Sequence, residues 1–294
     1  MHGGLRTSVR RLQLDKTRGA LRIRERELPW GAQTYLMGIV NVTPDSFSGD
    51  GRADPAQAIA YALEQHSRSA DILDIGGQST RPGYTPIGSA VEKKRLIPVI
   101  EGVRSRLGAQ AIVSVDTFDP SVFRAALDAG ADILNSIWGL TSELLEVVTE
   151  YKTPLVIMHN KDVASYEDVV DEVLRFLDEG AGRAVRAGVA AEHVILDPGI
   201  GFGKSPEHNI AMLRALKRLV ALGFPTLAGT SRKSTIGKLT GREPLERGFG
   251  TAATVALAIA AGVDIVRVHD VSEMRDVIAV GDAIERGWRP PSWT

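Results

Sequence analysis

Eight short apolar runs rich in Ile, Val and Leu recur along the chain, and each closes on a Gly, Asn, Asp, Ser, Thr or His residue. Most are followed by a stretch with helical periodicity. The runs are nearly continuous rather than alternating, which predicts strands covered on both faces, as in a parallel sheet under helices. The expected strands are 35–41, 71–76, 111–116, 132–136, 155–159, 193–197, 226–230 and 264–269.

The helices between these runs have recognisable ends. Asp54-Pro55, Asp119-Pro120 and Ser205-Pro206 each supply an N-cap followed by proline at the first helical position. Eight β/α repeats over about 255 residues predict an α/β fold, a (β/α)₈ TIM barrel of typical size. A doubly wound open sheet is the alternative, but no Gly-rich dinucleotide fingerprint supports it. We expect residues 1–33 to form an extension that caps the barrel bottom, and residues 34–294 to form one barrel domain.

Composition excludes several classes of partner. The 35 basic and 36 acidic side chains leave a net charge of −1, so no overall field favours nucleic acid or an anionic membrane. The chain has no cysteine, which excludes disulfides, thiolate metal sites and cysteine nucleophiles. The first residues carry arginines but no apolar stretch of signal-peptide length, so we expect a cytoplasmic protein.

Polar residues gather where the expected strands end, and in a barrel those ends meet at one mouth. Any single one could merely cap the next helix. Together they would be costly to desolvate without a ligand. The acids and amide suit a heterocycle with ring N–H and amine groups, and the cations suit an anion such as diphosphate. We expect the acids at one end of the pocket and the cations at the other. The set is Asn41, Asp74, Asp116, Asn135, His159, Asp197, Lys233, Arg267 and His269.

Two loops add to this set. The glycines of residues 199–204 (GIGFGK) permit close approach of a flat ligand, although the spacing is not that of a phosphate-binding P-loop. A tight turn without a ligand is the other reading. Residues 231–234 (SRKS) leave a strand and open a helix, so Ser234 and the free backbone N–H groups predict a carboxylate site.

Six stretches, each at the end of an expected strand, resemble the dihydropteroate synthase family in family order, and the likeness extends over residues 37–280. They are residues 37–48 (MGIVNVTPDSFS), 74–83 (DIGGQSTRPG), 114–117 (SVDT), 196–204 (LDPGIGFGK), 231–234 (SRKS) and 267–270 (RVHD). The resemblance implies a transferase of folate biosynthesis. Its members join 6-hydroxymethyl-7,8-dihydropterin diphosphate to p-aminobenzoate with loss of diphosphate.

The resemblance also implies roles for individual residues. The pterin would be held by Asp116, Asn135, Asp197, Lys233, Met158, Ile200 and Phe202. The diphosphate would be held by Asn41, Thr80, Arg267, Val268 and His269, and p-aminobenzoate by Phe47, Thr80, Pro82 and Ser234. The catalytic residues would be Asp45, Arg81, Lys233, Arg267 and His269.

A metal ion and a partner chain are implied as well. Asn41 would bind Mg²⁺, and the family is homodimeric, with small molecules as its substrates. The mechanism implied is dissociative: diphosphate leaves first, and the aryl amine captures the pterin methylene cation.

The chain departs from the family pattern at a few positions. Gln78 stands where Glu is usual and Ser136 where Asp is usual, so two carboxylates are missing. The stretch after His159 differs too, and the bulk of Phe249 predicts crowding of the aminobenzoate site that would discriminate against sulfonamides. A catalytically impaired pterin-binding paralogue and a pterin-dependent methyltransferase therefore stay open as alternatives.

Overall fold

A computed structural model of the chain describes residues 19–43, 54–78, 87–290 and 292. Eight parallel strands stand in the order β8-β7-β6-β5-β4-β3-β10-β9, and a bridge from Leu196 to Thr226 joins the first of them to the last. The predicted (β/α)₈ barrel is confirmed. The strands are β3 (Tyr35–Asn41), β4 (Ile72–Gly76), β5 (Ile112–Asp116), β6 (Ile133–Ser136), β7 (Leu155–Met158), β8 (Val194–Asp197), β9 (Leu227–Ala228) and β10 (Ile265–Val268).

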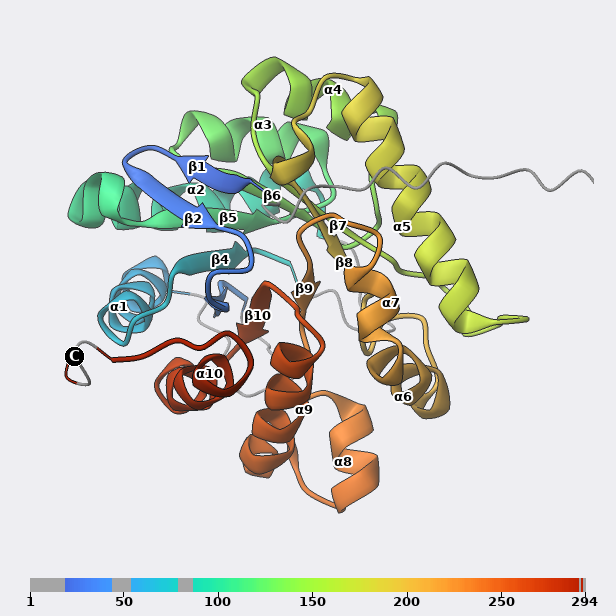
Figure 1. Cartoon of the computed structure of the whole chain (residues 1–294). Coiled ribbons are helices and arrows are strands. Elements are labelled where there is room, and N and C mark those ends of the chain that lie inside the picture. Colours follow the sequence, from blue (N-terminus) through green and yellow to red (C-terminus); the bar gives the residue numbers. More distant parts are fainter. Residues whose placement is uncertain (1–18, 44–53, 79–86, 291, 293–294) are drawn as a thin grey trace, which may run out of the picture.

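The helices surround the strands (Figure 1) and begin where the sequence predicts. Asp54, Asp119 and Ser205 each accept a backbone N–H bond from the first turn of α1, α3 and α6. The helices are α1 (Pro55–Ser67), α2 (Ser89–Leu107), α3 (Pro120–Asp128), α4 (Ser142–Tyr151), α5 (Val169–Arg186), α6 (Pro206–Arg214), α7 (Leu216–Val220), α8 (Ser234–Thr240), α9 (Gly248–Ala260) and α10 (Val271–Glu285), with 3₁₀ turns η1 (Gly108–Gln110), η2 (Ala191–His193) and η3 (Pro244–Glu246).

An antiparallel hairpin of β1 (Ala20–Ile23) and β2 (Arg26–Pro29) lies in front of the barrel strands in Figure 1. Its buried side chains form one apolar cluster with residues near the starts of the barrel strands. The N-terminal end of the barrel is therefore filled, which leaves the opposite end for a site. The cluster comprises Leu21, Ile23, Leu28, Trp30, Tyr35, Met37, Ile72, Ile112, Ile133, Val156, Ile195, Leu227 and Ile265. Residues 1–18 of the expected extension lie outside the described residues.

Three of the strands that begin one residue later than predicted leave out an aspartate. Asp71, Asp132 and Asp264 lie just before β4, β6 and β10 rather than inside them. Each accepts the N–H of a residue in or beside a neighbouring strand: Leu36 at 2.8 Å, Val113 at 2.8 Å and Thr226 at 2.9 Å. Strand starts leave backbone donors that need acceptors, and these side chains supply them.

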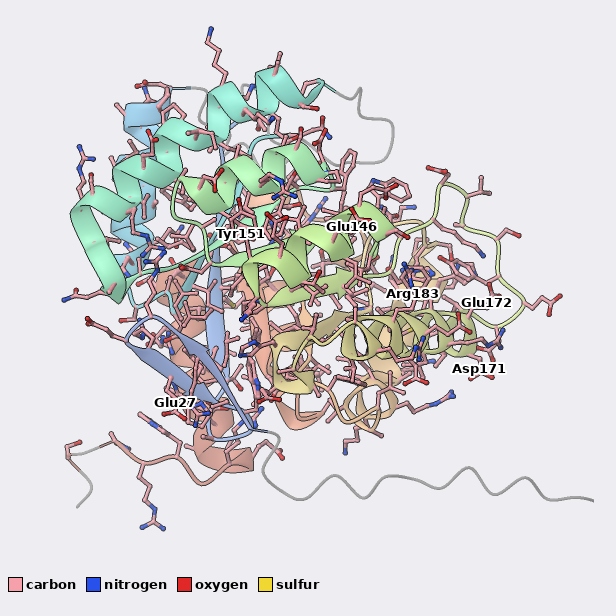
Figure 2. All side chains as sticks on the ribbon, turned by 90° about the horizontal axis from the view of Figure 1, so that it is seen from above. Glu27, Glu146, Tyr151, Asp171, Glu172 and Arg183 are labelled. Atoms are coloured by element: carbon pink, nitrogen blue, oxygen red, sulfur yellow. The ribbon has the colours of Figure 1, made fainter. Side chains whose placement is uncertain are left out.

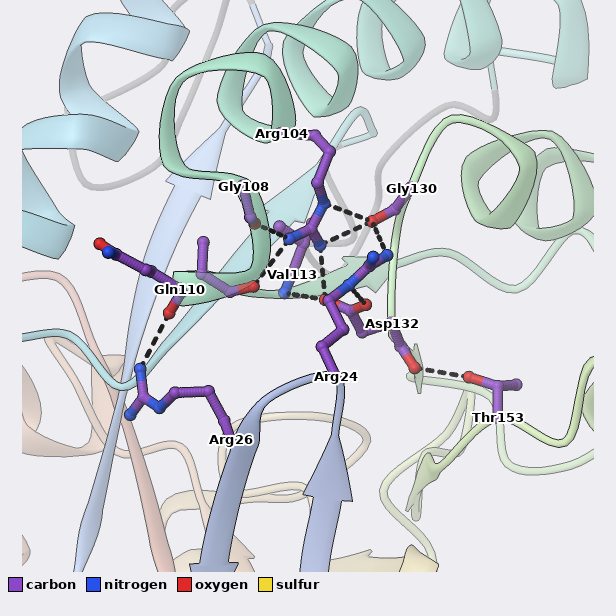
Figure 3. A network of polar contacts seen from close by, with 10 residues as sticks. Arg24, Arg26, Arg104, Gly108, Gln110, Val113, Gly130, Asp132 and Thr153 are labelled. Carbon is purple, nitrogen blue, oxygen red and sulfur yellow. Dashed lines mark hydrogen bonds and ion pairs between the residues drawn. The ribbon is translucent and has the colours of Figure 1, made fainter.

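The network around Asp132 joins the hairpin to the barrel (Figure 3). One oxygen of Asp132 accepts from Arg24 of the hairpin turn at 2.6 Å, and the other accepts from Arg104 of α2 at 2.6 Å. Arg104 also donates to the carbonyl oxygens of Gly130 and Ala111. Two cations and one buried carboxylate thus hold three parts of the chain together.

The part of the chain that the structure describes contains no helix long and apolar enough to span a membrane.

Candidate active site

A cavity at the C-terminal ends of the strands brings together residues from six of the barrel's strand ends and the loops that follow them. It encloses about 320 Å³ of empty space when its open mouth is included. All seven residues expected to hold the pterin line it, and Arg267 joins them. The lining is Asp116, Asn135, Ile137, Met158, Asp197, Gly199, Ile200, Phe202, Gly229, Lys233 and Arg267.

The glycines of the β8–α6 loop are required by close backbone approach. Gly199 and Gly201 have φ of +67° and +84°. A Cβ on Gly199 would lie 2.0 Å from the carbonyl oxygen of His159, and one on Gly201 would lie 2.7 Å from the Lys233 side chain. The Lys233 ammonium lies 3.8 Å from the centroid of the Phe202 ring, a cation–π contact. The loop therefore forms one wall of the cavity directly from its backbone.

Arg267 of β10 lies between two carboxylates. Its Nε donates to Asp74 at 2.6 Å and its terminal nitrogen donates to Asp116 at 3.0 Å. The prediction that the acids and cations occupy opposite ends of the pocket is therefore wrong. A guanidinium in a barrel lined with apolar side chains needs countercharges within reach, and the acids of β4 and β5 provide them.

Asp74 is the functional residue that sequence reasoning noted without assigning a role. Its side chain is fully buried, and the oxygen that binds Arg267 also accepts from the Asn135 carboxamide at 3.0 Å. It is absent from the cavity lining, yet it orients two residues that are present there. The available signal was a carboxylate in the middle of the otherwise apolar strand β4.

Burial brings ionisable groups of the cavity toward neutral pH. Loss of water raises the pKa of Asp116 to about 7, against the opposing effect of Arg267. Burial also raises the pKa of Asp197, although the N–H of Gly199 donates to it at 2.7 Å. Burial and the charge of Arg267 lower the pKa of Lys233 to about 8. Such shifts are typical of sites that bind polar ligands.

The other predicted residues have different positions. Asn41 ends β3 and is partly exposed, Ser234 is the exposed first residue of α8, and the His269 ring contacts the Ser231 hydroxyl at 2.9 Å. Val268 is fully buried in the apolar core, because side chains alternate along β10 and Arg267 faces the barrel interior. Only its backbone could meet a diphosphate. Asp45, Phe47, Thr80, Arg81 and Pro82 lie outside the described residues.

The departures from the family pattern are accommodated in the fold. The buried Gln78 carboxamide oxygen accepts the backbone N–H of Ile87 at 2.9 Å, and the Ser136 hydroxyl donates to the carbonyl oxygen of Gly139 at 2.6 Å. Phe249 is 94% exposed, so its ring does not crowd the cavity formed by the described residues. The expected effect of Phe249 on sulfonamide binding stays a prediction, because Phe47, Thr80 and Pro82 of the expected aminobenzoate site lie outside the described residues.

Metal ligands are sparse in the described ranges. No group of three or more His, Cys, Asp and Glu side chains there converges on a point that could hold an ion. Asn41 offers one neutral oxygen donor at the barrel mouth. Mg²⁺ commonly keeps several waters and is held by few protein ligands together with substrate phosphates, so this donor fits an ion that arrives with a diphosphate.

Residues 37–269 match the family model described as pterin binding enzyme. The dihydropteroate synthase of Synechocystis sp. is 45% identical over 271 residues, covering 88% of this chain and 92% of that protein. The crystal structure of the Clostridium difficile dihydropteroate synthase in the presence of pteroic acid has a TM-score of 0.82 at 44% identity, covering 87% of this chain and 98% of that one. The Xanthomonas albilineans enzyme with 4-aminobenzoic acid has a TM-score of 0.84 at 42% identity, covering 92% and 99%.

Proposed function

The chain belongs to the dihydropteroate synthase family of pterin-binding enzymes, and we propose that the cavity at its barrel mouth is where it joins a pterin diphosphate to p-aminobenzoate. It is a transferase that forms 7,8-dihydropteroate and releases diphosphate. The observation that carries the assignment is the lining of one cavity by two carboxylates, a carboxamide and two cations around an apolar slot.

In this proposal the polar edge of the pterin binds Asp116, Asn135 and Asp197. A pterin edge presents ring N–H and amine donors beside acceptors, and the two carboxylates with one carboxamide complement that pattern. Met158, Ile200 and Phe202 would contact the flat faces of the ring. Lys233, held over the Phe202 ring, would donate to a ring acceptor.

The leaving diphosphate would lie toward Arg267, His269 and Asn41. Arg267 is fixed by Asp74 and Asp116, so its geometry is set before the ligand arrives. Asn41 would hold Mg²⁺, whose charge would offset that of the diphosphate. We propose that Asp45, Thr80 and Arg81, which lie outside the described ranges, also contribute to the reaction at this end of the cavity.

We propose a dissociative reaction. The bond between the pterin methylene carbon and the diphosphate oxygen breaks, and its electron pair leaves with diphosphate. The carboxylates of Asp116 and Asp197 stabilise the positive pterin that results. The amine nitrogen of p-aminobenzoate then bonds to the methylene carbon and loses a proton. A strong general base is unnecessary, because an aryl amine is a neutral nucleophile. Ser234, with Phe47 and Pro82, would hold the aminobenzoate.

The assay that tests this function follows diphosphate release from 6-hydroxymethyl-7,8-dihydropterin diphosphate. We expect release that requires both Mg²⁺ and p-aminobenzoate, because the cation must be captured for turnover. Tight pterin binding without turnover would instead identify an impaired paralogue. Methyl transfer to a corrinoid, without diphosphate release, would identify the methyltransferase alternative.

Pterin affinity should depend on pH through two cavity groups. Asp116 titrates at about pH 7 and Lys233 at about pH 8, so both are charged chiefly between these values. Below pH 7 Asp116 gains a proton, and above pH 8 Lys233 loses one. The dissociation constant of uncharged 6-hydroxymethyl-7,8-dihydropterin, measured by calorimetry, should therefore be lowest near pH 7, because Lys204 behind the β8–α6 loop, whose pKa burial lowers to about 7, also loses its proton as the pH rises. Asp116→Asn should remove the acid limb; an unchanged acid limb in that variant would refute the assignment.

Exposed apolar side chains on α9 and α10 support a homodimer. Phe249 and Leu257 are 94% and 68% exposed on one face of α9, and Val280 and Ile284 are 62% and 74% exposed on one face of α10. The two helices pack against each other, and we call these four exposed side chains the α9–α10 face. We propose that this face is the interface between two copies of the chain, each burying its exposed apolar side chains against the other.

Light scattering after gel filtration should therefore give the mass of a dimer. Leu257→Asp combined with Ile284→Asp should give a monomer, because each charge would be buried unpaired. Val163→Asp, at a position 69% exposed elsewhere, is the matched control and should stay dimeric. A monomeric wild-type chain would refute the proposal.

A further inference from the structure

Lys204 follows the glycines of the β8–α6 loop, and the reaction described above gives it no role. Its ammonium lies 3.1 Å from the carbonyl oxygens of Gly199 and Phe202, and 3.4 Å from that of His159. A fourth acceptor is the Nδ1 of the His159 ring at 3.0 Å. Four acceptors therefore surround a group with three N–H donors.

The partners of this ammonium are neutral. No carboxylate among the described residues forms an ion pair with Lys204. The His159 ring is buried, and loss of water together with the charge of Lys204 lowers its pKa to about 3, so the ring is neutral. Its Nδ1 accepts from Lys204 and its proton lies on Nε2. Burial lowers the pKa of Lys204 itself to about 7, against the opposing effect of the Asp197 carboxylate, which lies beyond ion-pair distance. A partly buried ammonium bound to carbonyl oxygens is costly, which calls for a function.

The carbonyl groups that Lys204 binds bracket the residues that line the cavity. Gly199 and Phe202 lie on either side of Ile200, which is 2% exposed and contributes to the cavity wall. The ammonium thus contacts both ends of this short turn, which the Phe202 N–H also closes by donating to the Gly199 carbonyl oxygen at 3.1 Å. It also ties the turn to His159, the residue that follows β7.

A second set of contacts comes from the β7–α5 loop. The Tyr166 hydroxyl donates to the carbonyl oxygen of Gly203 at 2.7 Å. A Cβ on Gly203 would lie 2.2 Å from the carbonyl oxygen of Lys161, so the two loop backbones are in direct contact. The β8–α6 loop is therefore supported on the side away from the cavity by groups that no pterin would touch.

We propose that Lys204 is a positioning residue for pterin binding: its ammonium gathers the carbonyl oxygens of Gly199, Phe202 and His159 and so holds Ile200 and Phe202 against the pterin ring. This inference rests on the proposed function. It assigns Lys204 a role through the loop rather than through direct contact with a substrate.

Lys204→Met tests the proposal, because methionine keeps most of the length and removes the charge and the donors. The measurement is the dissociation constant of 6-hydroxymethyl-7,8-dihydropterin and of its diphosphate, each without p-aminobenzoate so that no turnover occurs. Both constants should rise about ten- to hundredfold, since small displacements of ligand-contacting groups have effects of this size. Lys217→Met on α7, at an exposed lysine, is the matched control and should change neither.

The absence of cysteine from the sequence allows a chemical rescue. Lys204→Cys can be alkylated with 2-bromoethylamine: the thiolate sulfur bonds to the carbon, bromide leaves, and a lysine-like ammonium is restored. We expect Lys204→Cys to bind the pterin weakly, and the aminoethylated protein, verified by mass spectrometry, to recover most of the affinity. Lys217→Cys treated in the same way should show no change at either step.

The outcomes separate this inference from the function it rests on. If the wild-type chain binds neither pterin, the proposed function fails. If the wild type binds but Lys204→Met binds equally well, the positioning role is wrong. A loss confined to the diphosphate would mean that Lys204 acts only as a distant charge. Failure of aminoethylation to restore affinity would assign the loss to a damaged fold, and either result would overturn the proposal.

Discussion

Replacing Arg267 by Met should lower kcat/KM about 100- to 1,000-fold, the usual effect of removing one preorganised charge from a transition state. It should also lower the free energy of unfolding by about 3–5 kcal/mol, because one partner of a buried ion pair is lost. Asp74 is fully buried and Asp116 is 10% exposed at the side chain, so neither carboxylate can turn to bulk water. Steady-state kinetics and urea unfolding measure the two effects separately.

A second variant separates stability from chemistry at this site. Asp74→Asn combined with Arg267→Met removes the fully buried one of the two stranded charges, and Lys233 still offsets the charge of Asp116. The carboxamide oxygen at position 74 can still accept from Asn135. We expect the double variant to recover most of the lost unfolding free energy and little of the lost kcat/KM. Recovery of activity together with stability would mean that Arg267 serves the fold alone.

The barrel and most of the cavity could be predicted from sequence because their signals are local. A strand buried on both faces gives a continuous apolar run, and the residue that ends it lies at the mouth whatever the rest of the chain does. This is why the sequence alone predicts that Asp116, Asn135, Asp197 and Lys233 meet in one site, as they do in the cavity. The same rule explains why the Val268 side chain faces the apolar core, since one step along a strand reverses the direction of the side chain.

The pairing of charges could not be predicted in the same way. Arg267 and Asp74 are 193 residues apart, and their contact depends on how far a guanidinium reaches across the barrel interior. No periodicity encodes that reach. The apparent loss of a family carboxylate at Gln78 is a similar case: only the fold reveals that its carboxamide oxygen accepts the N–H of Ile87. Sequence patterns place residues at the barrel mouth. Side-chain length and burial then decide which of those residues pair with one another.

Burial should also decide how much the ion pairs around Asp132, at the N-terminal end of the barrel, contribute to the free energy of unfolding. Asp132 and Asp171 each have an arginine nitrogen at 2.6 Å, yet their side chains are 5% and 52% exposed. Asp171 lies on α5 at the outer edge of the molecule in Figure 2, whereas Asp132 lies between Arg24 and Arg104. Asp132→Ala should lower the free energy of unfolding by about 3–5 kcal/mol, because two arginines and the Val113 N–H lose their acceptor.

Asp171→Ala is the matched control and should cost about 0–1 kcal/mol, because water screens an exposed pair and replaces its partner. Urea unfolding of both variants measures the contrast. Folded Asp132→Ala should keep its kcat/KM within about twofold, since the network lies at the end of the barrel away from the cavity and distant sites rarely couple. Equal losses of stability in the two variants would show that the length of the ion pair, rather than its burial, governs its contribution to stability.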